Sequence, residues 1–242
     1  MKTNNLFIIL AIFGLIITSC SVDTIRVDGN DYITTKNYNY FNYSAIEISS
    51  GFNAYVTFSD TEESIEIEAN DNLFPYIITS NNNNTLVVKL KNNINIRGAS
   101  TLKVHIKTKS ITSFKASADT RIYLQNKFIA NNAKISLSAD SFFTGELDVN
   151  SLQYYGSADT RSDLKGKVNF LDANLTADSK ISNYGLEIND LKIKMSADCD
   201  AYLTILGTID VNAVADCTLY YKGNATIINQ HLVADSRIIK KQ

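Results

Sequence analysis

The pattern of apolar and polar positions divides the chain into separate short strands and, after them, a fixed repeat. In the first part apolar residues alternate with polar ones, a period of two that is typical of β-strands with one buried face. Turn-prone runs such as SDTEES and NNNN separate the alternating segments. The pattern predicts strands over residues 45–48, 55–58, 65–69, 85–90 and 102–106.

From Phe114 onward a period of about 19 residues dominates the pattern. The dipeptide Ala-Asp occurs seven times, and gaps of 21, 19, 19, 20, 18 and 19 residues separate its aspartates. A repeat of this length fits one turn of a β-solenoid, because a turn holds two or three short strands and their bends. The aspartates are Asp119, Asp140, Asp159, Asp178, Asp198, Asp216 and Asp235.

Small or apolar residues stand at the odd offsets from each aspartate. The residue one before is always Ala, the residue one after is Ser, Thr or Cys, and the residues three before and three after are mostly apolar. Because side chains alternate faces along a strand, all of these positions are predicted to line the interior. The even offsets then form outward rows of hydroxyls, carboxylates and cations, the cations being Arg121, Arg161, Lys180 and Arg237.

These observations predict an all-β chain that folds as a single-stranded parallel β-helix, or β-solenoid, with coils of about 19 residues. We expect one continuous domain over residues 43–238 with roughly ten coils. A polar, tyrosine-rich segment over residues 20–42 is expected to act as a tether, and residues 239–242 form a tail.

The N-terminus has the pattern of a targeting segment. Residues 1–19 hold one positive charge and then an apolar run, Leu6 to Ile17, which has the length of a signal-peptide core. The run ends in Ile-Thr-Ser-Cys, which resembles the bacterial lipobox, so Cys20 is the predicted site of lipidation. We therefore expect an outer-membrane lipoprotein of the cell envelope, held to the membrane through Cys20, with the leaflet left open.

Composition narrows the function classes. Lys2 leaves with the predicted signal peptide, so 22 Lys and Arg face 25 Asp and Glu, and the charges are interspersed. A nucleic-acid partner would need a clustered basic face, so none is expected. Trp is absent, Pro75 is the one proline, and Tyr, Ile, Thr and Asn abound, a mixture that favours strands and turns.

Several motifs together resemble a known family. The motifs are GFNAYV at residues 51–56, the run from Ile65 to Leu73, TLVV at residues 85–88 and the recurring Ser-Ala-Asp. They resemble the family of auto-transporter adhesins with a head GIN domain, over residues 43 to 238. The resemblance implies a β-helix and an adhesin-like role. The family repeat more usually has Gly where this chain has Ala, so a left-handed backbone is not expected at that step.

The aspartate row has a structural and a chemical interpretation. Stacked carboxylates repel, so each is expected to accept hydrogen bonds from neighbouring N–H and hydroxyl groups while the cations neutralise part of the row. The chemical alternative is Ca²⁺ between stacked carboxylates, with Asp198, Asp200 and Asp216 as the densest acidic spot. No cofactor is otherwise expected.

The remaining candidate residues are cysteines, tyrosines and histidines, and most of them are interpreted as structural. Cys199 and Cys217 share one offset in consecutive coils and are expected to be a reduced, buried pair, although an exported compartment permits a disulfide. Among the tyrosines that could stack on sugars, Tyr154 and Tyr221 are assigned to the core, and Tyr155 and Tyr220 to edges. The two histidines, His105 and His231, are far apart in sequence and indicate no metal cluster or catalytic triad.

The sequence therefore favours a non-enzymatic module, a scaffold or an adhesin-like protein that binds a glycan or protein ligand through a flat Ser/Asp/Arg face. The alternative is a carbohydrate-active β-helix enzyme, a polysaccharide lyase or glycoside hydrolase, which would need a groove with converging acids outside the repeat. A third reading is end-to-end polymerisation through exposed terminal strands.

Overall fold

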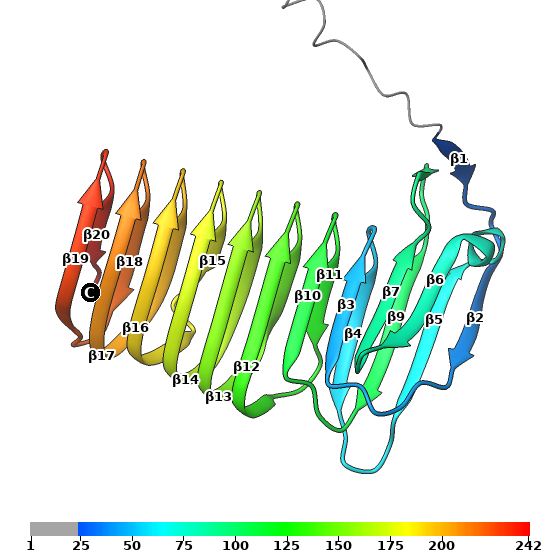
Figure 1. The fold of residues 1–242 in the computed structure, drawn as a ribbon, viewed down its shortest axis with the longest axis horizontal. Helices are drawn as coiled ribbons and strands as arrows, with labels where there is room; N and C mark the ends of the chain where they lie inside the picture. The colour runs from blue at the N-terminus through cyan, green and yellow to red at the C-terminus, as the bar shows by residue number, and fades with distance from the viewer. Residues whose placement is uncertain (1–23) are drawn as a thin grey trace, which may run out of the picture.

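The computed structural model describes residues 24–242, and the predicted signal peptide and Cys20 lie outside them. This part of the chain is nearly all β, with 68% of its residues in strands and 3% in helix. The described residues form a two-stranded sheet and an 18-stranded sheet that winds along the length of the molecule (Figure 1). No helix among them has the length and apolar character needed to cross a membrane.

The strands fall into two groups. The N-terminal region is defined here as residues 33–112 and the regular solenoid as residues 113–240. Before and within the N-terminal region lie β1 (Ile25–Asp28), β2 (Ile33–Tyr38), β3 (Ala45–Ser49), β4 (Asn53–Phe58), β5 (Ser64–Asn70), the 3-10 helix η1 (Asp71–Tyr76), β6 (Ile77–Asn82), β7 (Thr85–Leu90), β8 (Ile94–Arg97) and β9 (Leu102–Thr108). The regular solenoid holds β10 (Ser113–Ser117), β11 (Arg121–Leu124), β12 (Phe128–Ser138), β13 (Phe142–Ser157), β14 (Arg161–Thr176), β15 (Lys180–Ser182), β16 (Leu186–Ser196), β17 (Asp200–Val214), β18 (Thr218–Lys222), β19 (Thr226–Val233) and β20 (Arg237–Lys240).

In the regular solenoid every strand pairs in parallel with the corresponding strand of the next coil. The register of β13 and β14 runs from Phe142 opposite Arg161 to Ser157 opposite Thr176, an offset of one repeat. The predicted solenoid with coils of about 19 residues is therefore confirmed. It has about seven turns, so the expectation of roughly ten is wrong.

The N-terminal region accounts for that difference, because its strands do not all follow the solenoid path. β3 and β4 stack in parallel on β10 and β11 and form one more coil. Beyond them β5 runs antiparallel to both β2 and β9, and β6 runs antiparallel to β7. The five strands predicted from alternation are confirmed as β3, β4, β5, β7 and β9. The segment expected to be a tether contributes β1, paired with β8, and β2.

Each Ala-Asp pair forms a sharp turn, and the turns line up along one edge of the molecule (upper edge in Figure 1). Both residues have positive φ in all seven repeats, for example 50° at Ala177 and 59° at Asp178, as a type I′ turn requires. The expectation that the backbone is not left-handed at the alanine is therefore wrong. Left-handed Ala costs about 1–2 kcal/mol, and stacking offsets this cost. The Asp178 N–H donates to the Ala197 carbonyl at 3.0 Å, and every other turn except the last, at Asp235, bonds to the next turn likewise.

Burial follows the predicted parity on both sides of the turn but not within it. The positions three before, one after and three after the aspartate are buried in the first six repeats and half-buried in the last. The alanines, predicted to be interior, are exposed in six repeats, and Ala215 is half-buried. The reason is that a two-residue turn places both of its residues outside, so the parity restarts after it.

In four of the seven repeats the small residue after the aspartate holds the turn from inside; these residues are Ser141, Ser179, Cys199 and Cys217. The Ser179 hydroxyl donates to the Thr176 carbonyl at 2.7 Å, and the Cys199 thiol donates to the Ser196 carbonyl at 3.3 Å. Each bond spans three residues across the turn and satisfies a carbonyl next to the core. The Thr160 hydroxyl donates to the Ser179 hydroxyl instead, and the buried Thr120 hydroxyl has no hydrogen-bond partner within the described residues.

Candidate functional site

The aspartate row lies along the edge formed by the turns, not on a flat strand face as predicted. All seven carboxylates are exposed. Within residues 24–242 none of them forms an ion pair within 4.0 Å or a side-chain hydrogen bond. Arg121 and Arg161 flank a shallow hollow with Asp119, Asp140 and Asp159. Lys180 pairs with Asp200 at 3.7 Å instead. The hydrogen bonds predicted for the row are thus not found among the described residues, and partial neutralisation by the neighbouring cations stays a prediction.

The three residues considered for calcium do not converge. Asp198 and Asp216 belong to successive turns, whereas Asp200 begins β17 and faces Lys180. Across the described part of the chain no group of three or more His, Cys, Asp or Glu side chains could hold a metal ion.

Cys199 and Cys217 are free and fully buried, one above the other in consecutive coils. The Cys199 N–H donates to the Cys217 sulfur at 3.4 Å. Burial raises the pKa of the Cys199 thiol to about 11 and also raises the pKa of the Cys217 thiol. Because the thiolate is the reactive form, both thiols are chemically inert in the folded protein.

The predicted division of the tyrosines is confirmed. Tyr154 is fully buried and Tyr221 nearly so. Tyr155 is exposed, with the Lys134 amino group 5.0 Å from its ring centroid. Tyr220 lies half-buried on the outer surface and stacks on Tyr202 with ring centroids 4.5 Å apart.

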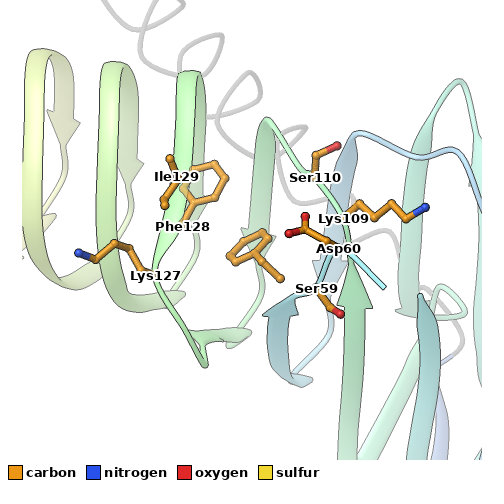
Figure 2. Close-up of a pocket in the computed structure, with 8 residues that line it drawn as sticks. Ser59, Asp60, Lys109, Ser110, Lys127, Phe128 and Ile129 are labelled. Atoms are coloured by element: carbon orange, nitrogen blue, oxygen red, sulfur yellow. The ribbon is translucent and has the colours of Figure 1, made fainter. Parts of the chain in front are cut away.

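The hollows that do not repeat gather in and beside the N-terminal region. The first, named the Phe58 hollow, has a volume of about 240 Å³ and lies where that region meets β12. Phe58 and Phe128 stack there at 5.1 Å, and Ile129 beside them is 72% exposed. Figure 2 shows that Lys109 and Lys127 point away from one another on opposite sides, with Ser59 and Asp60 between them.

A second hollow, named the Tyr55 groove, has a volume of about 570 Å³ on the outer face of β5, β9, β4 and β11. The antiparallel pairing of β5 with β9 places Glu66 opposite His105, and the parallel pairing of β9 with β4 places His105 opposite Tyr55. Its lining residues are Tyr55, Thr57, Ser64, Glu66, His105, Ile106, Lys107 and Gln125.

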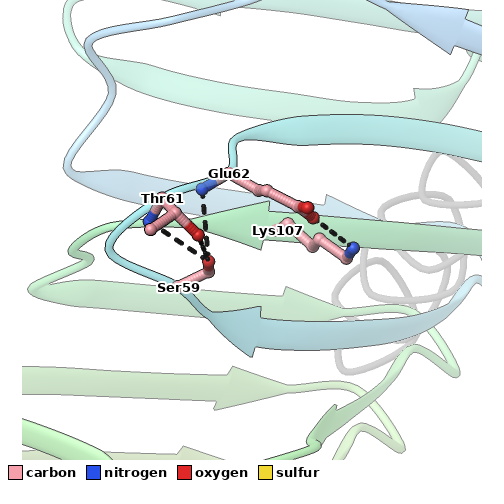
Figure 3. A network of polar contacts seen from close by, with 4 residues as sticks. All are labelled: Ser59, Thr61, Glu62 and Lys107. Carbon is pink, nitrogen blue, oxygen red and sulfur yellow. Dashed lines mark hydrogen bonds and ion pairs between the residues drawn. The ribbon is translucent and has the colours of Figure 1, made fainter.

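The loop between β4 and β5 separates the two hollows and is held by its own polar contacts. The Ser59 hydroxyl oxygen accepts the N–H groups of Thr61 at 3.4 Å and Glu62 at 3.2 Å. Lys107 forms an ion pair with Glu62 at 2.6 Å, and this contact lowers the pKa of the Glu62 carboxyl (Figure 3). The loop therefore gives the Phe58 hollow a fixed wall, and its ion pair holds Lys107, which lines the Tyr55 groove.

Sequence reasoning placed the candidate site on the repeat and missed this groove. Of its lining residues only His105 received attention, as an isolated surface histidine. Aligning β4 and β9 with the repeat would have stacked Tyr55, His105 and Tyr123, because each stands at the second outward position of its strand. The antiparallel position of Glu66 has no signal in the repeat.

Comparisons with known proteins agree with this architecture. A family described as "Putative auto-transporter adhesin, head GIN domain" matches residues 42–225. A structure described as a putative adhesin from Bacteroides fragilis is 18% identical, with a TM-score of 0.75, and the match covers 88% of this chain and 99% of that one. At this identity the likeness shows the fold alone.

Two further structures are similar. A protein described as a putative lipid binding protein from Parabacteroides distasonis is 16% identical, with a TM-score of 0.72 and coverage of 90% of this chain and 100% of that one. An adhesin-labelled protein from Parabacteroides merdae is 17% identical, with a TM-score of 0.64 and coverage of 90% and 99%. None of the curated proteins matches the chain in sequence.

Proposed function

Because the chain belongs to the auto-transporter adhesin, head GIN domain family, we propose that it is a non-enzymatic, adhesin-like binding module of the bacterial cell envelope. The observation that carries this proposal is the position of the Tyr55 groove, an open recognition surface on a rigid scaffold. Parallel coils share one continuous core, so the surface changes little on binding and the entropy cost of binding is small.

The groove favours binding over glycan cleavage. Glycoside hydrolysis uses a pair of carboxyl groups on either side of the bond to be broken. Glu66 is the one carboxylate among the lining residues of the groove, and the nearby Glu62 and Glu68 are held in ion pairs with Lys107 and Lys103. The acids are thus arranged as recognition and structural groups.

Adhesion of the intact protein tests this role. Beads that carry the full chain, purified in detergent, are washed under flow over surfaces coated with a mucin-type glycoprotein, an extracellular matrix protein or albumin. We expect retention on the glycoprotein or the matrix protein above that of beads with heat-unfolded chain. Equal retention of folded and unfolded chain on every surface would refute an adhesin-like role.

The proposal includes a membrane tether at Cys20, which would hold the solenoid at the envelope through a lipid-modified N-terminus. Expression in a Gram-negative host with labelled palmitate tests the tether. The wild-type chain is expected to carry label and to fractionate with the outer membrane, and Cys20→Ala is expected to lose both properties. Label that persists in Cys20→Ala would place the modification elsewhere.

A further inference from the structure

The Tyr55 groove is the place where aromatic rings meet a carboxylate without an ion pair among the described residues, that of Glu66, and the amide of Gln125, whose Nε2 donates to the Tyr123 carbonyl at 3.5 Å. Tyr55 stacks on His105 with ring centroids 5.0 Å apart and on Tyr123 at 5.2 Å, with an interplanar angle of 14° in both pairs. The three rings therefore form a short ladder across β9, β4 and β11. The ladder ends at His105, whose partner on β5 is Glu66 and not another ring.

A second ladder of rings lies on the same face, and it differs from the first in being covered by lysines. It consists of Tyr184, Tyr202 and Tyr220. Lysines cover these rings: Lys180 lies 4.8 Å from the Tyr202 centroid, Lys222 lies 5.1 Å from that of Tyr184, and Lys241 lies 5.3 Å from that of Tyr220. Within residues 24–242 no cation lies over Tyr55 or Tyr123.

The polar groups around the first ladder suit hydroxyls better than charges. Lys107 is committed to Glu62, and Lys103 is committed to Glu68 at 2.9 Å. Glu66 has no ion pair within 4.0 Å in the described chain, so it presents a free carboxylate to the groove, and Gln125 adds an amide. A carboxylate in the groove would repel an acidic ligand and would accept hydrogen bonds from a neutral one.

We propose that the Tyr55 groove binds a neutral oligosaccharide. The apolar C–H face of a sugar ring packs against His105 at the end of the ladder, with Tyr55 stacked behind it, and its hydroxyls donate to the Glu66 carboxylate and exchange hydrogen bonds with the Gln125 amide. The stacked rings and the loop held by Ser59 and Lys107 keep this arrangement rigid before binding. The inference rests on the proposed adhesin-like role and names its ligand class.

The test is binding of the labelled full chain to a printed array with neutral hexose and N-acetylhexosamine oligosaccharides beside sialylated and uronate-containing ones. We expect binding to neutral members and affinity for them that falls about tenfold or more in His105→Ala and in Glu66→Gln, the size typical of a central contact residue. Glu66→Gln keeps the shape of the side chain, so it removes the carboxylate without opening the fold.

Tyr202→Ala is the matched control, since Tyr202 occupies the same outward position in its coil as Tyr55 and Tyr123 do in theirs. It is expected to retain wild-type affinity. Binding to acidic glycans alone, or equal loss in Tyr202→Ala, would overturn the assignment. No array binding by a chain whose beads still adhere would overturn the ligand class and leave the adhesin-like role, whereas loss of both would refute the two together.

Discussion

The regular solenoid and the N-terminal region are both built from β-strands, but they pair these strands differently. In the solenoid, parallel in-register stacking puts each residue beside its own equivalent, so side chains form uniform rows. In the N-terminal region the reversal at β5 brings unlike residues together, such as Glu66 beside His105 and Glu68 beside Lys103. The repeated coils thus form a regular scaffold, and the candidate groove lies where the strand pairing departs from the repeat.

The interactions that stabilise the two regions also differ. The solenoid places an unpaired carboxylate and a left-handed Ala at every turn, and a continuous core and backbone ladder offset these costs. In the N-terminal region Lys103 and Lys107 of β9 pair with Glu68 of β5 and with Glu62 of the preceding loop. The solenoid also has ion pairs, Lys127 and Lys165 with Glu146 and Lys180 with Asp200, but none of them involves the aspartate row.

The largest expected effect tests whether the two regions fold as one unit. Phe114 is fully buried in β10, which pairs with β3 on one side and β12 on the other, and its ring meets those of Phe128 and Phe143 edge-on at 5.2 and 5.3 Å. Phe114→Ala is expected to lower the free energy of unfolding by about 3–5 kcal/mol. Urea unfolding followed by circular dichroism and tyrosine fluorescence measures the change.

Phe170→Ala is the control for this substitution, because Phe170 is 39% exposed and its removal is expected to cost less than about 1 kcal/mol. A single transition in both probes is expected. Two transitions, with only the later coils affected by Phe114→Ala, would show that the regions unfold separately.

The next effect depends on pH and belongs to the solenoid core. Burial raises the pKa of Cys199 to about 11, so the unfolded chain releases this proton first and stability is lost as pH rises from the ordinary thiol pKa through that value. Cys199→Ser places there the residue that Ser179 supplies in the preceding coil. Relative to this variant, the wild-type chain is expected to lose about 1–2 kcal/mol over the interval, measured by urea unfolding. Parallel pH profiles would show that the thiol does not titrate differently on folding.

A smaller effect of opposite sign is expected at the turns. Ala177 has a φ of 50°, a conformation that Gly adopts without strain. Ala177→Gly is therefore expected to raise the free energy of unfolding by about 0.5–1 kcal/mol, after the greater flexibility of the unfolded chain is subtracted. Ala173→Gly, at a buried strand position of the same coil, should instead destabilise. Thermal melts compare the two, and a destabilising Ala177→Gly would disprove strain at the turn.

The contrast between the regions also decides what sequence could predict. The period of the Ala-Asp repeat and the alternation around it were sufficient for the solenoid, the coil length and the buried rows, because parallel stacking copies one local pattern. The turn was mispredicted at Ala118 and its equivalents because stacking between coils, a non-local effect, outweighs the preference of Ala. The coil count failed where β5 reverses.

The groove was beyond the reach of periodicity for the same reason. Glu66, His105 and Gln125 are far apart in sequence, and only the antiparallel placement of β5 against β9 brings the first two side by side. The aspartate row, which the repeat made conspicuous, forms no group that could hold a metal ion within the described residues. A residue that recurs in every coil thus indicates the coil geometry. The candidate groove is formed instead by residues that do not recur, beside the antiparallel strand β5.

The two smallest predicted effects have opposite signs, one in the regular solenoid and one in the N-terminal region. Asp159 stands between the like charges of neighbouring turns without an ion pair, and Asn tolerates the left-handed conformation equally well, so Asp159→Asn is expected to stabilise by a few tenths of a kcal/mol. Glu68→Gln breaks the pair with Lys103 in the N-terminal region and is expected to destabilise by about 0.2–1 kcal/mol. At low salt the urea midpoint of Asp159→Asn should lie above that of the wild-type chain and the midpoint of Glu68→Gln below it. At high salt both midpoints should approach the wild-type value, because salt screens both interactions. A destabilising Asp159→Asn would mean that the carboxylate row is held by contacts of its own, and the two regions would then share one electrostatic design.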